Sequence, residues 1–318
     1  MIRILLDFLI FCAGIKLGDL AGRRRLLTKK RLMRAYLKAT GGHGPWSIGI
    51  LQGSDPLDMK QVPANPVLTG ASVSDMDALF VADPFVVPHG DTLYMFFEIM
   101  ARRDEKGCIG VAESRDGIGW KYRSVVLEEV FHLSFPLVFE ERGHFYMVPE
   151  SSDDWSVRLY RAKRFPFEWE YQGNLVSGYQ YKDPTLFRHL GRWWMFVSAG
   201  KNEIMNIYHA EELLGPWQPH RANPVIRNDK ARARSAGKVL ELDGRLVRFA
   251  QDNSRKYGRQ VSAWEIEALD VQQYRERSLG SRPVVGPSGS GWNRAGMHTF
   301  NPFRWGDGWL ACTDGRRF

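Results

Sequence analysis

The stretch ADPFVVPHGDTLYMFFE, residues 82–98, decides the fold of this 318-residue chain. An Asp-Pro pair opens a first apolar run, a His-Gly-Asp bend follows, and Tyr94 to Phe97 form a second apolar run. Two apolar runs of strand length, separated by a short bend that contains Gly, are typical of a β-hairpin. The stretch therefore predicts two antiparallel strands joined by a tight turn.

The same pattern recurs four more times along the sequence. Each copy has a polar or Pro-containing start, an apolar run, a Gly at the bend and a second apolar or aromatic run. The copies are SFPLVFEERGHFYMVPE (134–150), KDPTLFRHLGRWWMFVS (182–198), SAGKVLELDGRLVRFAQ (235–251) and HTFNPFRWGDGWLACT (298–313). Corresponding positions in the second runs are 48 to 62 residues apart, at Tyr94, Tyr146, Trp194, Val247 and Trp309. Strand repeats with a period of about 50 residues predict an all-β, five-bladed β-propeller.

The two ends of the repeat region complement each other. The tetrapeptide Ala-Asn-Pro-Val occurs at 64–67 and again at 222–225, in the outer part of the third repeat. The segment from residue 45 therefore supplies outer strands without an inner hairpin, whereas 298–318 supplies an inner hairpin without outer strands. Together they complete one blade, and a closed ring leaves no exposed sheet edge. We expect a propeller over residues 45–318, closed by its N- and C-terminal strands.

The N-terminal segment, residues 1–44, is a separate unit in this prediction. Residues 1–40 contain ten Lys/Arg and two Asp, which leaves 34 basic and 34 acidic residues in the rest of the chain. An apolar lead-in followed by basic residues interleaved with leucines predicts a helical extension that contacts an anionic membrane surface. The alternatives are a helix packed on the propeller and a poorly ordered terminus. Because the rest of the chain has no net charge, we expect no nucleic-acid partner.

Other site chemistry is absent from the sequence. The three cysteines have no metal or redox spacing, and Cys108 and Cys312 fall in strand-like runs, which predicts buried free thiols. No dinucleotide-binding, phosphate-binding, zinc-protease or serine-hydrolase motif occurs. We expect no cofactor and no metal, although a carboxylate-lined channel is able to hold Ca²⁺ through its oxygens. The expected location is cytoplasmic, including a peripheral position at the inner membrane face.

The repeat pattern gathers charged residues at one end of the channel. The inner strand of a blade lines the channel, and the second strand returns antiparallel, so Asp83 and Glu98 lie at the same end. Residues at equivalent positions join them there: Glu150, Asp183, Asp252, His132, His298, Arg232 and Arg234. Trp292, in a Gly-rich loop, is a candidate for stacking on a sugar ring. Crowded carboxylates have different pKa values, which suits glycoside chemistry with one protonated and one ionised group.

Longer motifs carry a resemblance to a known family. They are WSIGILQG (46–53), FVADPFVV (80–87), YMFFE (94–98), GVAESRDGIGW (110–120), FHLSFPLVFE (131–140), VRLYRA (157–162), YKDPTLF (181–187), GPWQPH (215–220), RFAQD (248–252) and GMHTFNP (296–302). Over about residues 45–318, the chain resembles the N-terminal domain of glucosamine inositolphosphorylceramide transferases and its bacterial stand-alone homologues. The Asp-Pro strand starts also resemble those of glycoside hydrolase family 43. Both resemblances imply a carbohydrate context, in envelope polysaccharide or glycolipid metabolism.

The family 43 resemblance implies roles for the carboxylates. It implies that Asp83 is the base or nucleophile and that Asp183 tunes pKa and orientation. The family usually places the acid at the start of the fourth inner strand, but ARSAGK (233–238) has no Glu, so Glu150 is the candidate acid. Glu98, His132, Arg234, Asp252, His298 and Trp292 are candidate substrate-binding residues.

Two functions stay open on these residues. The first is glycosyl hydrolysis or transfer on a sugar or glycolipid substrate, which the concentration of carboxylates favours. The second is a non-catalytic glycan-binding or docking propeller in a membrane-bound glycan assembly machinery, which the missing acid favours. Asp-Pro at a strand start is also often a plain turn, in which the Asp side chain accepts hydrogen bonds from backbone amides.

Overall fold

The computed structural model describes residues 46–318, which form an all-β unit. The chain divides into two compact units, Met1–Gly42 and His43–Phe318. The helical extension and the membrane contact expected in residues 1–44 lie outside the described residues and stay predictions. Among the described residues, no helix has the length and apolar character that crossing a membrane requires.

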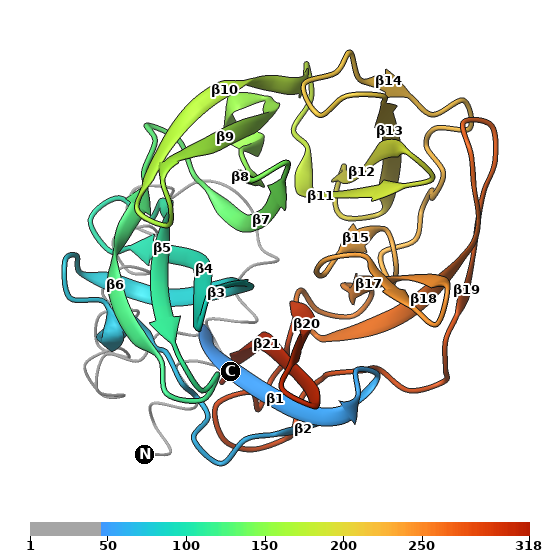
Figure 1. The fold of residues 1–318 in the computed structure, drawn as a ribbon. Coiled ribbons are helices and arrows are strands. Elements are labelled where there is room, and N and C mark those ends of the chain that lie inside the picture. The colour runs from blue at the N-terminus through green and yellow to red at the C-terminus, as the bar shows by residue number, and fades with distance from the viewer. Residues whose placement is uncertain (1–45) are drawn as a thin grey trace, which may run out of the picture. The chain divides into compact units, whose positions relative to one another are not determined.

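Five antiparallel sheets are arranged as blades around a ring, which confirms the predicted five-bladed propeller (Figure 1). Each predicted hairpin supplies the two inner strands of one blade. Blade 1 contains β3 (Ala78–His89), β4 (Thr92–Ala101), β5 (Gly107–Ser114) and β6 (Lys121–Leu127). Blade 2 contains β7 (Ser134–Glu141), β8 (His144–Glu150), β9 (Ser156–Arg164) and β10 (Glu168–Ser177). Blade 3 contains β11 (Lys182–His189), β12 (Arg192–Ala199), β13 (Ile204–Ala210) and β14 (Gln218–Pro219).

The last two blades differ from this plan in their details. Blade 4 contains β15 (Arg234–Ser235), β16 (Leu240–Leu242), β17 (Arg245–Asp252), β18 (Gln260–Leu269) and β19 (Tyr274–Ser278). Its inner edge is split into two short strands, β15 and β16, which both pair with β17. Blade 5 contains β20 (Phe300–Trp305), β21 (Gly308–Arg316), β1 (Trp46–Asp55) and β2 (Asp58–Gln61).

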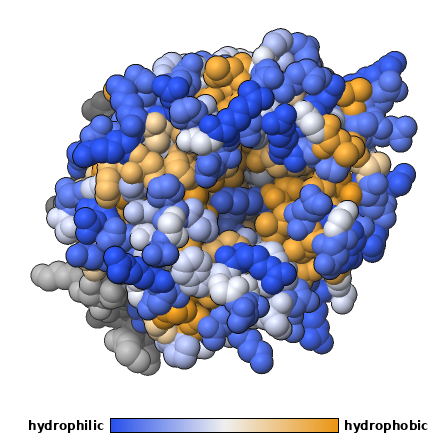
Figure 2. Space-filling view, viewed as in Figure 1, coloured by the Kyte–Doolittle hydropathy of each residue, from blue (hydrophilic) through white to orange (hydrophobic). Residues whose placement is uncertain are grey.

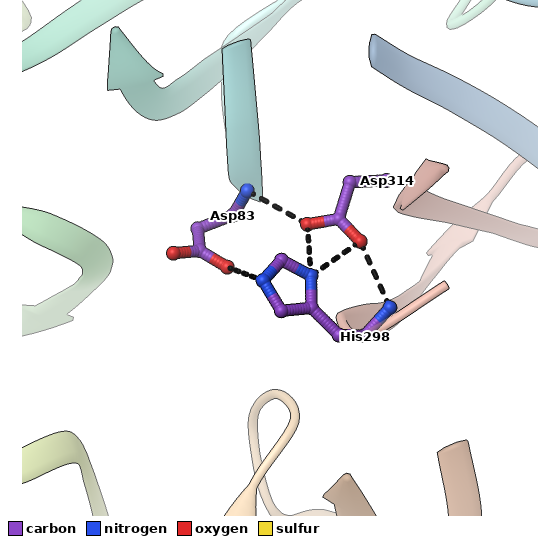
Figure 3. Close-up of side chains that lie close together, drawn as sticks. All are labelled: Asp83, His298 and Asp314. Carbon is purple, nitrogen blue, oxygen red and sulfur yellow. Dashed lines mark hydrogen bonds and ion pairs between the residues drawn. The ribbon is translucent and has the colours of Figure 1, made fainter. Parts of the chain in front are cut away.

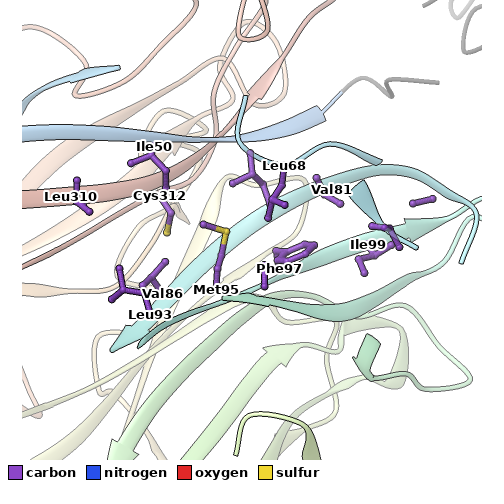
Figure 4. Packing of buried hydrophobic residues seen from close by; sticks show 14 of the residues in the cluster. Ile50, Leu68, Val81, Val86, Leu93, Met95, Phe97, Ile99, Leu310 and Cys312 are labelled. Atoms are coloured by element: carbon purple, nitrogen blue, oxygen red, sulfur yellow. The ribbon is translucent and has the colours of Figure 1, made fainter. Parts of the chain in front are cut away.

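Blade 5 closes the ring as the sequence predicts, because its sheet order is β2-β1-β21-β20. The N-terminal strand β1 pairs with the C-terminal strand β21 over eight residues, from Trp46 opposite Arg316 to Gly53 opposite Trp309. A buried apolar cluster lies between blade 5 and blade 1, with Ile50 and Cys312 on one side and Met95 and Phe97 on the other (Figure 4). The first and last strands of the propeller are thus joined both by backbone pairing and by core packing.

Strand direction places the chain's loops at two ends of the channel. Inner strands begin at one end, second strands return to it, and the loops between second and third strands follow there. We call this end the carboxylate mouth, because it holds Asp83, Glu98, Glu150, Asp183 and Asp314. The hairpin bends, such as the one at Leu190, lie at the opposite end.

Three of the five inner strands contain one residue with an unusual backbone conformation. Asp83, Phe135 and Asp183 have φ of 52°, 46° and 47°, in the left-handed region. At each of them the pairing of the first and second strand shifts by one residue, as in a β-bulge. Non-glycine residues adopt this conformation only where their surroundings enforce it. At Asp83 and Asp183, the backbone N–H of the bulged residue donates to a carboxylate of the neighbouring blade.

Candidate active site

The carboxylate mouth brings five buried acidic side chains together. Asp83 lies at a bulge within β3 and Asp183 at the start of β11, whereas Glu98, Glu150 and Asp314 lie in the second strands β4, β8 and β21. Their exposed fractions are 5%, 0%, 6%, 6% and 0%. Acidic residues are almost never fully buried unless they are paired. The partners of each carboxyl group therefore decide what the cluster can do.

Asp183 is fully paired by side chains of blade 4. The Arg234 guanidinium donates from Nε to Oδ2 at 2.5 Å and from Nη2 to Oδ1 at 2.9 Å. The Gln251 amide donates a further hydrogen bond to Oδ2 at 2.6 Å. Burial acts to raise the pKa of Asp183, but Arg234 lowers it below its ordinary value. Asp183 is therefore an ionised, fixed carboxylate, and its side chain does not cap backbone amides as an ordinary Asp-Pro turn would.

Glu150 is held by three donors. Its Oε2 accepts the Asp183 backbone N–H at 3.1 Å and a longer bond from Arg234 Nη2 at 3.4 Å, and its Oε1 accepts the Ser152 hydroxyl at 3.1 Å. Burial and the nearby Asp183 carboxylate raise the pKa of Glu150 to about 8. Arg234 thus lies between two acidic side chains, and only one of them needs to be ionised to balance its charge.

Asp83, His298 and Asp314 form a second group (Figure 3). Asp314 accepts the backbone N–H groups of Asp83 and His298, each at 3.0 Å, and contacts the His298 Nδ1 at 2.7 Å. His298 stacks on Trp46 with ring centroids 4.0 Å apart, and its Nε2 lies 3.6 Å from Asp83 Oδ1. Burial acts to lower the pKa of His298, but the two carboxylates raise it above its ordinary value. Asp314 therefore orients a histidine that faces Asp83.

Asp83 and Glu98 are the sparsely paired members of the cluster. Among the described residues, the only polar side-chain contact of Asp83 is with His298, and the only one of Glu98 is with His132 Nε2 at 3.5 Å. Burial raises the pKa of Asp83, and nearby carboxylates oppose its ionisation further. Burial, together with Glu150, raises the pKa of Glu98 to about 8. The mouth therefore contains carboxyl groups that hold a proton near neutral pH beside carboxylates that do not.

His132 faces Glu98 as a neutral donor. Its Nδ1 accepts the Gly107 backbone N–H at 2.9 Å, so its own proton lies on Nε2 and faces Glu98. Burial lowers the pKa of His132 and favours this neutral form.

A metal ion has three potential ligand atoms here. Asp83, His298 and Asp314 each offer one, all within 4.8 Å of one another. One histidine and two carboxylates are a reasonable ligand set for a divalent ion. However, Asp314 already accepts backbone N–H groups from three residues, including Thr299. These hydrogen bonds account for its ionised state without an ion, and the expected lack of a metal stays a prediction.

Two predicted site residues lie outside the cluster. Asp252 accepts hydrogen bonds from Ser254 and Gln260 and thereby organises the loop that follows β17. Trp292 packs its ring against the backbone of Gly49 and Gly315, where an added Cβ would lie 2.4 Å and 2.3 Å from ring atoms. Its indole N–H donates to Gln61. No contact of Trp292 with the acidic cluster occurs among residues 46–318, so its role in sugar stacking stays a prediction.

Three residues of the site were not in the predicted set. Gln251 is the fourth repeat's equivalent of Glu98, and Asp314 comes one residue after the fifth repeat's equivalent, Thr313, in a blade that lacks the register shift of blade 1. Tyr257 lies in an irregular loop, where no repeat pattern marks it. Its ring contacts Arg234 at 5.4 Å and His298 at 5.3 Å, and it is 41% exposed. Tyr257 therefore covers part of the cluster and still faces solvent.

The ring has a hollow at its centre on the face in Figure 2, with hydrophilic residues at its depth. The fold defines a class, the five-bladed β-propellers. The β-1,2-mannobiose phosphorylase of Listeria innocua has a TM-score of 0.61 and 12% identity, with 84% of this chain and 96% of that one covered. A family 117 glycoside hydrolase produced by Zobellia galactanivorans has a TM-score of 0.54 and 13% identity, with 84% and 90% covered. At these identities the likeness shows the fold alone.

Sequence comparison places the chain in one family. The model of the N-terminal domain of glucosamine inositolphosphorylceramide transferase 1 matches residues 39–316, and the chain belongs to this family. The glucosamine inositolphosphorylceramide transferase 1 of Oryza sativa subsp. japonica is 35% identical over 302 residues. That match covers 87% of this chain but 40% of the rice protein, so the chain spans less than half of that relative's length.

Proposed function

We propose that the propeller is a carbohydrate-active domain that hydrolyses or transfers a glycosyl group at the carboxylate mouth. The observation that carries this proposal is the division of the acidic cluster. Asp183 and Asp314 are ionised and paired with cations, whereas Glu98 and Glu150 have pKa values of about 8. Acid–base chemistry at a glycosidic bond requires this combination of protonated and ionised carboxyl groups.

Asp83 is the base or nucleophile in this proposal. Its carboxylate has no strong hydrogen-bond donor among the described residues, and one of its oxygens points away from His298 (Figure 3). A raised pKa makes a carboxylate a stronger base once the proton has moved to His298. Asp183, fixed by Arg234, keeps its charge and raises the pKa of Glu150. Glu150 is the acid that we propose, and Glu98 is the competing candidate because fewer donors hold it.

The substrate class follows from the acidic mouth and from the family. A mouth rich in carboxyl groups disfavours anionic sugars and accepts neutral or amino sugars. The relatives' name joins glucosamine to inositolphosphorylceramide, and we propose a glycolipid head group or an envelope glycan as the substrate.

We also propose a cytoplasmic protein whose residues 1–40 contact the inner membrane face.

A panel of 4-nitrophenyl glycosides and matching disaccharides tests the proposed chemistry. Asp83→Asn is expected to lower turnover of both substrate types by about 10²–10⁴-fold, because the base or nucleophile is lost. A variant that lacks the general acid is expected to lose turnover of the disaccharides but to keep turnover of the 4-nitrophenyl glycosides, because 4-nitrophenolate leaves without protonation. Glu150→Gln and Glu98→Gln then show which residue is the acid. Glu168→Gln, at an exposed position of β10 outside the cluster, is the control and should behave as wild type.

A binding or docking propeller is the second candidate. Arg234 bonds both Asp183 and Glu150, which is how a structural charge cluster would be balanced. If the wild-type protein binds glycans of the panel but turns over none of them, this second function holds and the catalytic proposal fails.

A further inference from the structure

We propose that Trp155 and Tyr179 form an aromatic subsite that stacks on a neutral hexose ring next to the sugar in the carboxylate mouth. This inference rests on the proposed carbohydrate function and adds where the substrate extends. Both residues lie on loops of the mouth: Trp155 follows β8, and Tyr179 precedes β11.

The two loops are attached directly to the acidic residues and to each other. Glu150 accepts the Ser152 hydroxyl at the start of the short helix η3 (Ser152–Asp154), and Trp155 follows that helix immediately. Gly178 donates its backbone N–H to the Trp155 carbonyl at 2.8 Å. Four residues after Tyr179, Asp183 donates its N–H to Glu150. These hydrogen bonds tie the loops of Trp155 and Tyr179 to each other and to the segments that carry Glu150 and Asp183.

Trp155 is held in a position that folding alone does not explain. Its backbone is left-handed, with φ of 57° and ψ of 32°, and its side chain is 54% exposed. Its ring makes no contact with another ring or cation among residues 46–318, whereas most tryptophans of the propeller are buried or pack against the core clusters. A bulky residue in this conformation costs stability, and its surroundings must enforce it. The neighbouring Asp154, held by Arg158 at 2.7 Å and 2.8 Å, fixes the turn.

Tyr179 provides a second exposed surface beside it. It is 44% exposed, and its ring contacts the buried Tyr181 at 5.9 Å. The Tyr181 hydroxyl is hydrogen-bonded to that of Tyr208 at 3.0 Å, so the support under Tyr179 is rigid. Rigid, exposed aromatic side chains supply contact area at little cost in conformational entropy. Their apolar faces match the C–H face of a neutral hexose, and the acidic mouth beside them repels a uronic acid.

The test uses the full chain and an array of immobilised tetrasaccharides: cellotetraose, mannotetraose, β-1,3-galactotetraose and tetragalacturonate. Trp155→Gly and Tyr179→Ala are each expected to weaken binding of a neutral tetrasaccharide by about two- to tenfold, which is the range of an aromatic contact. Leu190→Gly is the matched control. Leu190 is also an exposed apolar residue with a positive φ of 49°, but it lies at the hairpin end. The Leu190→Gly variant should bind the neutral tetrasaccharides as the wild-type protein does.

The thermal midpoint gives a second readout without ligand. Gly suits a left-handed position, so Trp155→Gly and Leu190→Gly should both leave Tm unchanged or raise it. A Tm of Trp155→Gly well below that of wild type would show that the ring packs in the fold and would overturn the subsite.

The binding outcomes separate this inference from the proposed function. Unchanged affinity in both aromatic variants, with turnover still lost in Asp83→Asn, would overturn the subsite alone. A wild-type protein that binds none of the neutral tetrasaccharides would overturn the subsite and weaken the proposed function with it. Preferred binding of tetragalacturonate would also contradict the inference.

Discussion

Asp83 and Asp183 have the same local structure but opposite surroundings. Both precede a proline at a bulge in the innermost strand of their blade, with φ of 52° and 47°. Both donate their backbone N–H to a carboxylate from the preceding blade, Asp314 for Asp83 and Glu150 for Asp183. The side chain of Asp183 then accepts three hydrogen bonds from Arg234 and Gln251, whereas that of Asp83 has only His298 at 3.6 Å.

The difference teaches that the Asp-Pro bulge is a scaffold of the repeat and does not define a chemical role. A neighbouring blade decides that role. Blade 4 places an arginine beside Asp183, which fixes it as an ionised group, and blade 5 places an oriented histidine beside Asp83, which leaves it free to exchange a proton. The same backbone element therefore supports one charged, rigid carboxylate and one reactive carboxyl group.

The largest effect is expected from removing the cation on the Asp183 side. Arg234→Gln leaves Asp183 and Glu150 buried without their charge partner, which typically costs about 3–5 kcal/mol of unfolding free energy. Urea denaturation measures it. Arg164→Gln is the control, because the Arg164–Glu168 pair is exposed and such pairs contribute about 0–1 kcal/mol. Equal losses in the two variants would mean that Arg234 does not balance a buried charge.

The two aspartates themselves give the next prediction. Asp183→Asn removes the charge that Arg234 and Gln251 bind and should cost about 2–3 kcal/mol, the range of hydrogen bonds to charged groups. Asp83→Asn removes a carboxyl group whose ionisation the fold opposes, so we expect a change within about 0.5 kcal/mol. Denaturation of both variants at pH 7 checks this. A larger loss for Asp83→Asn than for Asp183→Asn would reverse the roles assigned to the two residues.

The blades and the ends of the propeller were predictable because their signals are local. Alternating apolar runs and Gly-containing bends specify each hairpin, and all five inner pairs occur where the repeats predict them. The closure of blade 5 was predictable because the N-terminal part of the propeller has outer strands without an inner hairpin, and the C-terminal part has an inner hairpin without outer strands. The equivalence of Asp83 and Asp183 followed from the Asp-Pro pair, since both strand starts have the same bulge.

The pairing of charges was not predictable, because it depends on distances between blades. Arg232 and Arg234 are two residues apart, and the strand start directs only Arg234 into the mouth. Arg232 instead contacts Asp229 at 2.7 Å and Glu276 at 3.3 Å. Tyr257 was missed for a related reason, since an irregular loop has no periodicity to indicate where its side chain lies. Local sequence patterns therefore locate the mouth, and packing between blades determines its electrostatics.

The smallest effect concerns Glu98, the other sparsely paired group. Its pKa is raised from 4.5 to about 8, so the folded state holds its proton more tightly than the unfolded state does. Unfolding between pH 5 and pH 8 then releases a proton, and this group lowers stability as pH rises through that window. Glu98→Gln removes the effect and should flatten the decline by about 1 kcal/mol per pH unit.

Denaturation of Glu98→Gln and wild type at pH 6 and pH 7 measures the difference in slope. Glu168→Gln, at an exposed position of β10, is the control and should keep the wild-type slope. If Glu98→Gln also keeps that slope, Glu98 is ionised in the fold, and Glu150 is the remaining glutamate with a raised pKa. The comparison is then between two groups: Asp83 with His298, and Asp183 and Glu150 with Arg234. Glu150 is the general acid in that case.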